Sequence, residues 1–111
     1  MSSKVRSRGW CFTLNNYTET DIESIKSIEN CKYIFQEETG EKKTKHLQGF
    51  IYFDNARSFT SLKKLLPKAH LEAARNKTAS IKYCSKEDTR TGKIYANFDY
   101  DTVTQLAPLT L

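Results

Sequence analysis

Apolar and polar residues along the chain recur with the periods of short strands and short helices. Runs rich in aromatic and β-branched residues, bounded by polar turns, indicate strands. The predicted strands cover residues 9–14, 32–38, 46–54, 70–74 and 94–98. Apolar residues at helical spacing indicate three helices. The predicted helices cover residues 19–28, the segment after Ser58, and residues 79–87.

Helix ends are marked by capping residues. Thr18 precedes a segment in which Ile22, Ile25 and Ile28 recur at helical spacing, and it is a good N-cap. Ser58 is the expected cap of the second helix, and Pro67 is expected to stop it. Three leucines are expected inside that second helix: Leu62, Leu65 and Leu66.

The order of elements predicts the fold class. The elements follow one another as β-α-β-β-α-β, and a helix and one more strand come after them. This order favours an α+β fold with a central five-stranded, mostly antiparallel sheet and a ferredoxin-like or RNA-recognition-like topology. The length of 111 residues suits one small domain. We expect that domain to occupy residues 1–98, with residues 99–111 as a tail or linker.

Charge is distributed unevenly along the chain. Eighteen Lys and Arg residues against thirteen Asp and Glu residues give a net charge of +5. Residues 19–38 carry six acids and two bases, whereas residues 55–93 carry ten bases and three acids. Bases beside aromatic rings are typical of single-stranded nucleic-acid binding. The residues expected to bind such a strand are Arg8, Trp10, Arg57, Lys63, Lys64, Arg75, Lys77 and Lys82.

Several classes of protein are disfavoured by the sequence. No apolar run is long enough for a transmembrane helix, and no apolar signal core follows the basic N-terminus. The three cysteines, Cys11, Cys31 and Cys84, include no CxxC pair. We therefore expect neither a disulfide framework nor a zinc site.

A candidate metal site lies on the predicted hairpin. His46 and Gln48 are two residues apart in one strand, so their side chains share a face. Glu38 lies just before the turn and close to His46 in pairing. One carboxylate, one imidazole and one amide oxygen suit Mn²⁺ or Mg²⁺ better than a thiolate-preferring ion.

A candidate nucleophile lies on the third predicted helix. Tyr83, Lys86 and Glu87 stand at i, i+3 and i+4, so they are expected to share one helical face. A neighbouring ammonium group and a metal would favour the phenolate of Tyr83. Glu87 could reach the same ion or orient a water. Together the two sites fit phosphoryl transfer to a tyrosine.

Three short motifs, in order, resemble a known family. They are Cys11-Phe12-Thr13-Leu14-Asn15-Asn16, His46-Leu47-Gln48-Gly49-Phe50 and Tyr83-Cys84-Ser85-Lys86-Glu87. The chain resembles the N-terminal HUH endonuclease domain of replication initiator (Rep) proteins of circular single-stranded DNA viruses, of the nanovirus and circovirus types. The second histidine of the wider superfamily is replaced by Gln48, as it is in those two branches.

The resemblance implies roles for individual residues. Tyr83 would be the nucleophile, assisted by Lys86, and His46, Gln48 and Glu38 would hold Mn²⁺ or Mg²⁺. Glu37 is the alternative acid ligand, because the strand register is open by one residue, and Glu87 is a candidate further ligand. The affinity and preference of the site for a metal are left open by Gln48, since an amide oxygen is a weaker ligand than imidazole.

The resemblance also implies a biological setting. Such proteins nick and rejoin single-stranded origin DNA at a stem-loop through a 5′-phosphotyrosine intermediate, which starts and ends rolling-circle replication. It implies work in the host nucleus. It further implies a helicase domain and self-association in a full-length protein.

Two other functions remain open at this stage. A non-enzymatic RNA-binding module of the same topology would need exposed aromatic side chains on its central strands, which Trp10, Phe12, Phe50 and Tyr52 could supply. A cysteine enzyme would use Cys84 or Cys11, but no histidine stands at helical spacing to activate Cys84.

Overall fold

A computed structural model describes residues 5–103 of the chain. The strands are β1 (Arg6–Asn15), β2 (Cys31–Thr39), β3 (Lys45–Ser58), β4 (His70–Ala73) and β5 (Arg90–Ala96). The helices are α1 (Glu19–Lys26), α2 (Phe59–Leu65) and α3 (Lys77–Cys84), with a 3₁₀ turn, η2 (Glu41–Lys43), between β2 and β3. Another helical turn begins at Tyr100, and the predicted tail beyond residue 103 lies outside the described residues.

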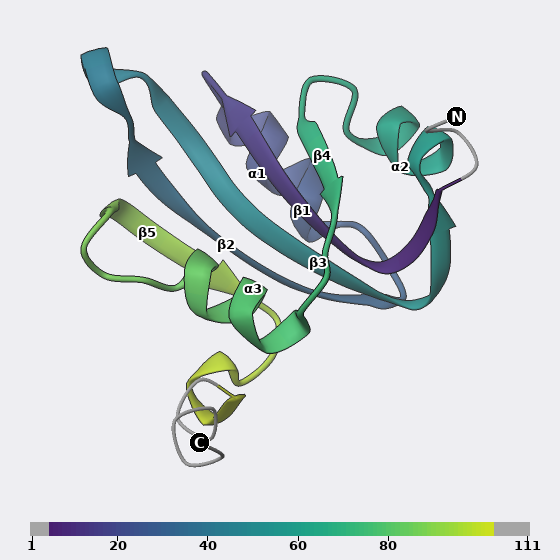
Figure 1. The fold of residues 1–111 in the computed structure, drawn as a ribbon. Helices are drawn as coiled ribbons and strands as arrows, with labels where there is room; N and C mark the ends of the chain where they lie inside the picture. Colours follow the sequence, from purple (N-terminus) through teal and green to yellow (C-terminus); the bar gives the residue numbers. More distant parts are fainter. Residues whose placement is uncertain (1–4, 104–111) are drawn as a thin grey trace.

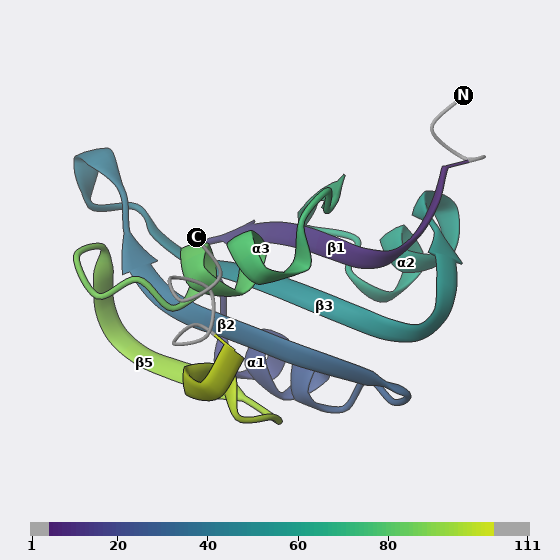
Figure 2. The same cartoon turned by 60° about the horizontal axis from the view of Figure 1, so that its bottom comes forward.

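The five strands form one sheet in the order β4-β1-β3-β2-β5, and every neighbouring pair is antiparallel. Figure 1 shows the long strands β1, β2 and β3 side by side at the centre of the molecule. Helices α1 and α3 lie on opposite faces of the sheet (Figure 2). The predicted α+β fold with a five-stranded antiparallel sheet is confirmed.

The larger part of the core lies on the face that α1 and α2 cover. Side chains at alternate positions of the strands enter it together with apolar residues of both helices. Its strand residues include Trp10, Phe12, Phe35, Leu47, Ile51 and Phe53. A Cβ at Gly49 would clash with the ring of Phe12, so glycine allows this ring to lie directly against β3. The glycine of the second motif is thus a packing residue.

Trp10 belongs to this core, which corrects its prediction as a DNA-binding residue. Its side chain is 1% exposed, its indole N–H donates to the carbonyl of Ser7, and its ring packs against Phe59. Strand alternation turns Trp10 to the face opposite His46. A ring buried in this way cannot stack on a base.

A smaller apolar cluster holds α3 on the other face. Ile81 and Cys84 of α3 pack against Ile34 of β2 and Phe50 of β3, and all four are buried. This contact places the C-terminal end of α3 over the central strands, and it leaves Tyr83 facing away from the cluster and 50% exposed.

Several element boundaries differ from the sequence prediction, and those of α3, β5 and α2 matter most for the site and the core. Helix α3 ends at Cys84, so Lys86 and Glu87 lie beyond it. The Ser85 side chain donates to the carbonyl of Ile81 and helps to end the helix there. Strand β5 covers residues 90–96 because it pairs with β2 from Glu38 onwards. Helix α2 ends at Leu65, so Leu66 is its C-cap and not an internal residue as predicted. Leu62 and Leu66 are buried, and Leu65 is 43% exposed.

Among residues 5–103, no helix is long and apolar enough to cross a membrane. All three cysteines are free.

Candidate active site

The candidate metal ligands meet across the β2–β3 hairpin. Glu38 and His46 are directly paired in the antiparallel register, as the sequence predicts. The Nε2 atom of His46 lies 3.1 Å from the Oε1 atom of Glu38. The His46 side chain is 17% exposed and the Glu38 side chain 7%, so the pair lies at the edge of solvent.

Gln48 lies two residues along β3, on the same face of the sheet as His46. Its amide N–H donates to the carbonyl of Phe12 at 3.3 Å, and its Oε1 accepts a hydrogen bond from the Thr13 hydroxyl at 3.3 Å. These contacts with β1 fix which end of the amide is the oxygen. A carbonyl oxygen can accept a second interaction, so Oε1 keeps the capacity to bind a cation.

The donor set fits a weak site for an oxygen-preferring ion. Within residues 5–103, no group of three or more His, Cys, Asp and Glu side chains could hold a metal. Glu38 and His46 supply two strong donors whose atoms already face each other, and a third must come from the Gln48 amide. One imidazole with carboxylate and amide oxygens suits Mn²⁺ or Mg²⁺.

Glu38 is held ionised by its neighbours. Burial raises the pKa of its carboxyl, but hydrogen bonds from Gln36, His46 and Thr89 and the charge of Lys86 outweigh burial and lower the pKa overall. Three of these donors converge on Oε2: Gln36 at 2.7 Å, Lys86 at 3.3 Å and Thr89 at 3.1 Å. Oε1 is therefore the oxygen that faces His46.

Tyr83 and Lys86 lie together, although Lys86 is beyond the helix. The ammonium nitrogen of Lys86 lies 3.5 Å from the centre of the Tyr83 ring and 3.2 Å from the Tyr83 carbonyl oxygen. The same nitrogen contacts Glu38, so one cation joins the candidate nucleophile to the candidate metal ligands.

The two remaining acids are not brought to this point. The side chain of Glu37 points to the opposite face from Glu38, where its carboxylate accepts a hydrogen bond from the Tyr95 hydroxyl at 2.8 Å. Glu87 is exposed and lines a separate hollow with Lys82 and Tyr100. Of the acids predicted as ligands, Glu38 is the one that contacts His46.

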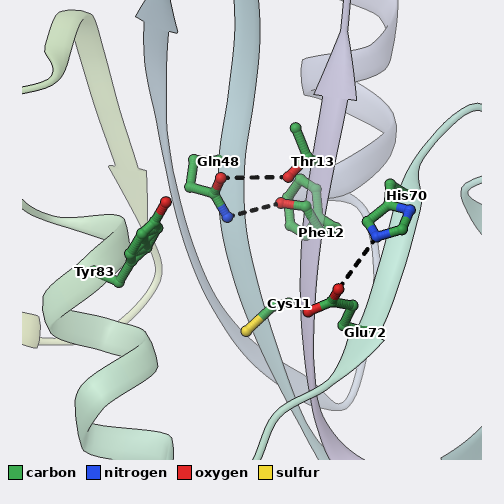
Figure 3. Close-up of a pocket in the computed structure, with 7 residues that line it drawn as sticks. All are labelled: Cys11, Phe12, Thr13, Gln48, His70, Glu72 and Tyr83. Carbon is green, nitrogen blue, oxygen red and sulfur yellow. Dashed lines mark hydrogen bonds and ion pairs between the residues drawn. The ribbon is translucent and has the colours of Figure 1, made fainter. Parts of the chain in front are cut away.

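A hollow of about 300 Å³ lies between Tyr83 and strands β1 and β4. Figure 3 shows Tyr83 on one side, His70 and Glu72 on the other, and Gln48 and Thr13 between them. Cys11 also lines it, and burial raises the pKa of the Cys11 thiol. Burial likewise raises the pKa of Cys84, so neither cysteine is an activated thiolate.

Three of the predicted DNA-binding residues gather beside this hollow. Arg8, Arg75 and Lys77 line a neighbouring hollow of about 360 Å³ together with Tyr52. The guanidinium carbon of Arg8 lies 4.6 Å from the centre of the Tyr52 ring, and the Lys77 ammonium nitrogen lies 4.1 Å from it. Cations around an aromatic ring are suited to a nucleic-acid strand.

The other predicted DNA-binding residues lie elsewhere. Arg57 covers the Phe53 ring at 4.8 Å and lines a hollow beside α1, on the opposite face. Lys63 and Lys64 are on α2, and the Lys63 ammonium is bound to the Ala69 carbonyl. Lys82 is exposed on the side of α3 that faces Tyr100. The structure brings none of these four basic residues to the hollow beside Tyr83 or to the hollow that Tyr52 lines.

Sequence reasoning missed Gln36, Thr89 and Arg90. Gln36 is fully buried and contacts Glu38, Lys86 and Arg90. No motif or period marks these residues, because each acts through a contact made about fifty positions away in the chain. The one available signal was a glutamine inside an otherwise apolar strand, Tyr33-Ile34-Phe35-Gln36, since a buried amide needs partners.

Comparisons with known proteins agree with the motifs. A protein-family model described as "Putative viral replication protein" matches residues 7–87. The chain is 46% identical over 84 residues to a Replication-associated protein of beak and feather disease virus. The aligned segment covers 72% of this chain and 29% of that protein.

Two further relatives extend the comparison. A Replication-associated protein of canary circovirus is 42% identical over 83 residues, covering 71% of this chain and 29% of the relative. A Master replication protein of subterranean clover stunt virus is 40% identical over 83 residues. The aligned segment covers 73% of this chain and 28% of that relative. The chain therefore spans less than a third of the length of these relatives.

Proposed function

This chain belongs to the family of viral replication proteins, and from that premise we propose that it nicks and rejoins single-stranded origin DNA at the start and end of rolling-circle replication. The observation that carries the proposal is the contact of one cation, Lys86, with both Tyr83 and Glu38. A site-specific single-strand endonuclease needs a nucleophile and a phosphate-neutralising site side by side.

Tyr83 is the proposed nucleophile. Its phenolate oxygen attacks the scissile phosphorus, the bond from phosphorus to the 3′-oxygen breaks, and the leaving oxygen takes a proton from solvent. The new phosphotyrosine bond stores the energy of the phosphodiester, so a later attack by a 3′-hydroxyl can reverse the step. Lys86 would assist the reaction by its charge, because its ammonium lies over the phenol ring and beside Glu38.

His46, Gln48 and Glu38 would hold a divalent metal, with Mn²⁺ or Mg²⁺ as the candidates. When bound, the ion would neutralise charge on the scissile phosphate. Glu38 would contribute Oε1, because Oε2 already accepts hydrogen bonds from three donors. Gln48 is oriented by Phe12 and Thr13, so its carbonyl oxygen is held on the face of the sheet that Tyr83 overlooks.

Arg8, Arg75 and Lys77 are the proposed phosphate contacts for the strand that enters the site. They lie around Tyr52, next to the hollow that Tyr83 lines. Tyr52 is the candidate for stacking on a base, since the other aromatic residues of β1, β2 and β3 are all buried. They are Trp10, Phe12, Tyr33, Phe35, Phe50 and Phe53. Their burial also removes most of the aromatic platform that a purely RNA-binding module of this topology would need.

The stem-loop form of the DNA, a following helicase domain, self-association and the host nucleus remain predictions for a longer protein. The aligned segment covers at most 29% of the length of these three relatives, so those proteins have room for further domains.

The test is incubation of the protein with a labelled single-stranded origin loop and Mn²⁺. We expect a covalent protein–DNA band that resists denaturation. Tyr83→Phe should abolish the band and keep the fold, because it removes a hydroxyl from a half-exposed ring. Tyr17→Phe serves as the matched control, since Tyr17 packs against the core on the other face. A band of normal intensity from Tyr83→Phe would contradict the assignment of the nucleophile.

A further inference from the structure

We propose that Gln36 and Arg90 are positioning residues that hold Lys86 and Glu38 in fixed places relative to each other, and through Lys86 govern the nucleophile Tyr83. The inference rests on the proposed nicking function. Neither residue lies in the three motifs, and neither touches the hollow beside Tyr83.

Gln36 joins the sheet to the turn that follows α3. Its side chain is 0% exposed and lies on the same face of β2 as Glu38. Its amide nitrogen donates to Oε2 of Glu38 at 2.7 Å and to the carbonyl of Lys86 at 2.9 Å. A single amide group therefore contacts both a candidate metal ligand and the backbone of the catalytic lysine.

Arg90 completes the connection from the edge strand. It is paired with Glu38 in the β2–β5 ladder, just beyond the register shift between Gln36 and Glu38. Its Nε donates to Oε1 of Gln36 at 3.0 Å, and its Nη2 donates to the carbonyl of Ser85 at 2.9 Å. The planar guanidinium thus orients the Gln36 amide and holds the turn at a second point.

These contacts determine where Lys86 lies. Helix α3 ends at Cys84. The Ser85 N–H still donates to the Lys82 carbonyl, but the carbonyls of Ser85 and Lys86 lie beyond the helix. Their two carbonyls are bound by Arg90 and Gln36 instead. With the backbone held at both carbonyls, the Lys86 ammonium reaches Tyr83 and Glu38 together. Without these bonds, the turn would be free to move, and displacement of a catalytic group by about 1 Å can cost a hundredfold in rate.

The experiment compares Gln36→Leu and Arg90→Met with the unmodified protein. The leucine and methionine side chains keep apolar bulk but cannot make the bonds. The matched control is Asn97→Ala, because Asn97 also bonds β2 through its side chain, to the Tyr33 N–H and the Cys31 carbonyl, at the end far from Glu38. Single-turnover formation of the covalent adduct is measured with a labelled single-stranded origin loop at saturating Mn²⁺. DNA affinity is measured without metal.

We expect both variants to form the adduct at least tenfold more slowly, with DNA affinity changed less than twofold. The double variant should be no slower than the slower single variant, because the two residues act as one unit. Arg90→Lys should recover part of the rate, since a lysine can reach one of the two acceptors. Asn97→Ala should lower the melting temperature but leave the rate unchanged.

Hydrogen–deuterium exchange supplies a readout that does not depend on nicking. Exchange of the segment 85–90 should rise in Gln36→Leu and Arg90→Met, and not in Asn97→Ala. Rates equal to that of the unmodified protein, or a loss of rate in Asn97→Ala as large as in Gln36→Leu, would overturn the positioning role. If the unmodified protein forms no adduct, the proposed function fails, and unchanged exchange in segment 85–90 would then overturn the positioning of Lys86 as well.

Discussion

Gly49 of the second motif has no side chain, and this absence gives the motif a packing role beside its candidate metal ligands. In His46-Leu47-Gln48-Gly49-Phe50, alternate side chains point to opposite faces of β3. His46 and Gln48 face the candidate site, whereas Leu47 enters the core beside Phe12 and Phe35. Gly49 lies under the Phe12 ring. The motif thus combines two candidate ligands with the packing that supports their strand.

Gly49→Ala should lower the free energy of unfolding by about 2 kcal/mol or more, because a methyl group must displace the buried ring of Phe12. Urea unfolding monitored by circular dichroism measures the loss. Gly40→Ala is the control, since a Cβ there would meet its nearest neighbour at 3.6 Å, an ordinary contact. Equal losses in the two variants would contradict the packing role of Gly49.

Removal of a metal ligand should be visible in thermal stability. With Mn²⁺ at a hundred times its dissociation constant, binding to the folded state stabilises by about 2.7 kcal/mol. His46→Ala should abolish this stabilisation. Gln48→His should keep or increase it, because imidazole is a stronger ligand than an amide oxygen. Melting curves over a Mn²⁺ titration measure both, and curves that do not respond to Mn²⁺ in the unmodified protein would remove the metal from the mechanism.

The shared face of His46 and Gln48 was predictable, because strand alternation fixes it from spacing alone. The pairing of Glu38 with His46 was expected, but the sequence left the register open by one residue and Glu37 as the alternative, and the structure selects Glu38. Trp10 was assigned wrongly, since its place in β1 was known but not which face of β1 meets the core. Gln36 was missed because its partners come from the far end of the chain.

Helix α1 shows how far local chemistry determines an element. The Thr18 hydroxyl accepts from the Asp21 N–H, and the Asp21 carboxylate accepts from the Thr18 N–H, a capping box that starts the helix at Glu19. The hydrogen bond from Lys68 is the largest of the effects that lower the pKa of Asp21, and bonds from Thr18 add to it against the opposing effect of burial.

Asp21→Asn should therefore destabilise the protein at neutral pH by about 0.5 kcal/mol, the scale of a partly exposed ion pair. A carboxyl whose pKa is lowered by folding stabilises above its unfolded pKa, and that contribution disappears as the pH falls through the folded value. The difference between variant and parent should shrink below about pH 4. Urea unfolding over a pH series measures it, and a difference that persists unchanged at pH 2 would contradict the charge argument.

The end of α3 and the start of β5 were beyond sequence reasoning for a common reason. Apolar residues at helical spacing favoured a helix as far as Glu87. In the structure, bonds from Gln36 and Arg90 hold the carbonyls of the turn, and pairing with Glu38 starts β5 at Arg90. Contacts between distant segments outweighed local preference at both boundaries.

The whole molecule has two unlike faces. One carries α1 and α2 over the larger apolar core, and the other carries α3, the hollow beside Tyr83 and the basic residues around Tyr52. The basic segment seen in the sequence is therefore divided between faces, and only part of it can serve a strand that reaches Tyr83.

Arg75→Ala should weaken binding to a cognate and a scrambled single-stranded loop alike. It should also flatten the salt dependence by roughly 0.7 log units of affinity per log unit of salt, because the variant neutralises one phosphate fewer. Arg57→Ala is the matched control and should change neither quantity, because Arg57 lies on the opposite face. Fluorescence anisotropy over a salt series measures both. A larger effect from Arg57→Ala than from Arg75→Ala would mean that the strand runs over the α1 face.

The position of β5 in the chain has a practical consequence for the choice of a shortened domain. Strand β5 lies after the last residue that the family model matches. The family match ends at residue 87, so a fragment cut there keeps every motif residue yet loses the edge strand. The fragment would expose the unpaired backbone groups of β2, and such an exposed strand edge promotes aggregation. It would also uncover Phe35, which Tyr95 stacks upon at 4.8 Å. Such a fragment would lack Arg90, and its inactivity would say nothing about the motifs it retains.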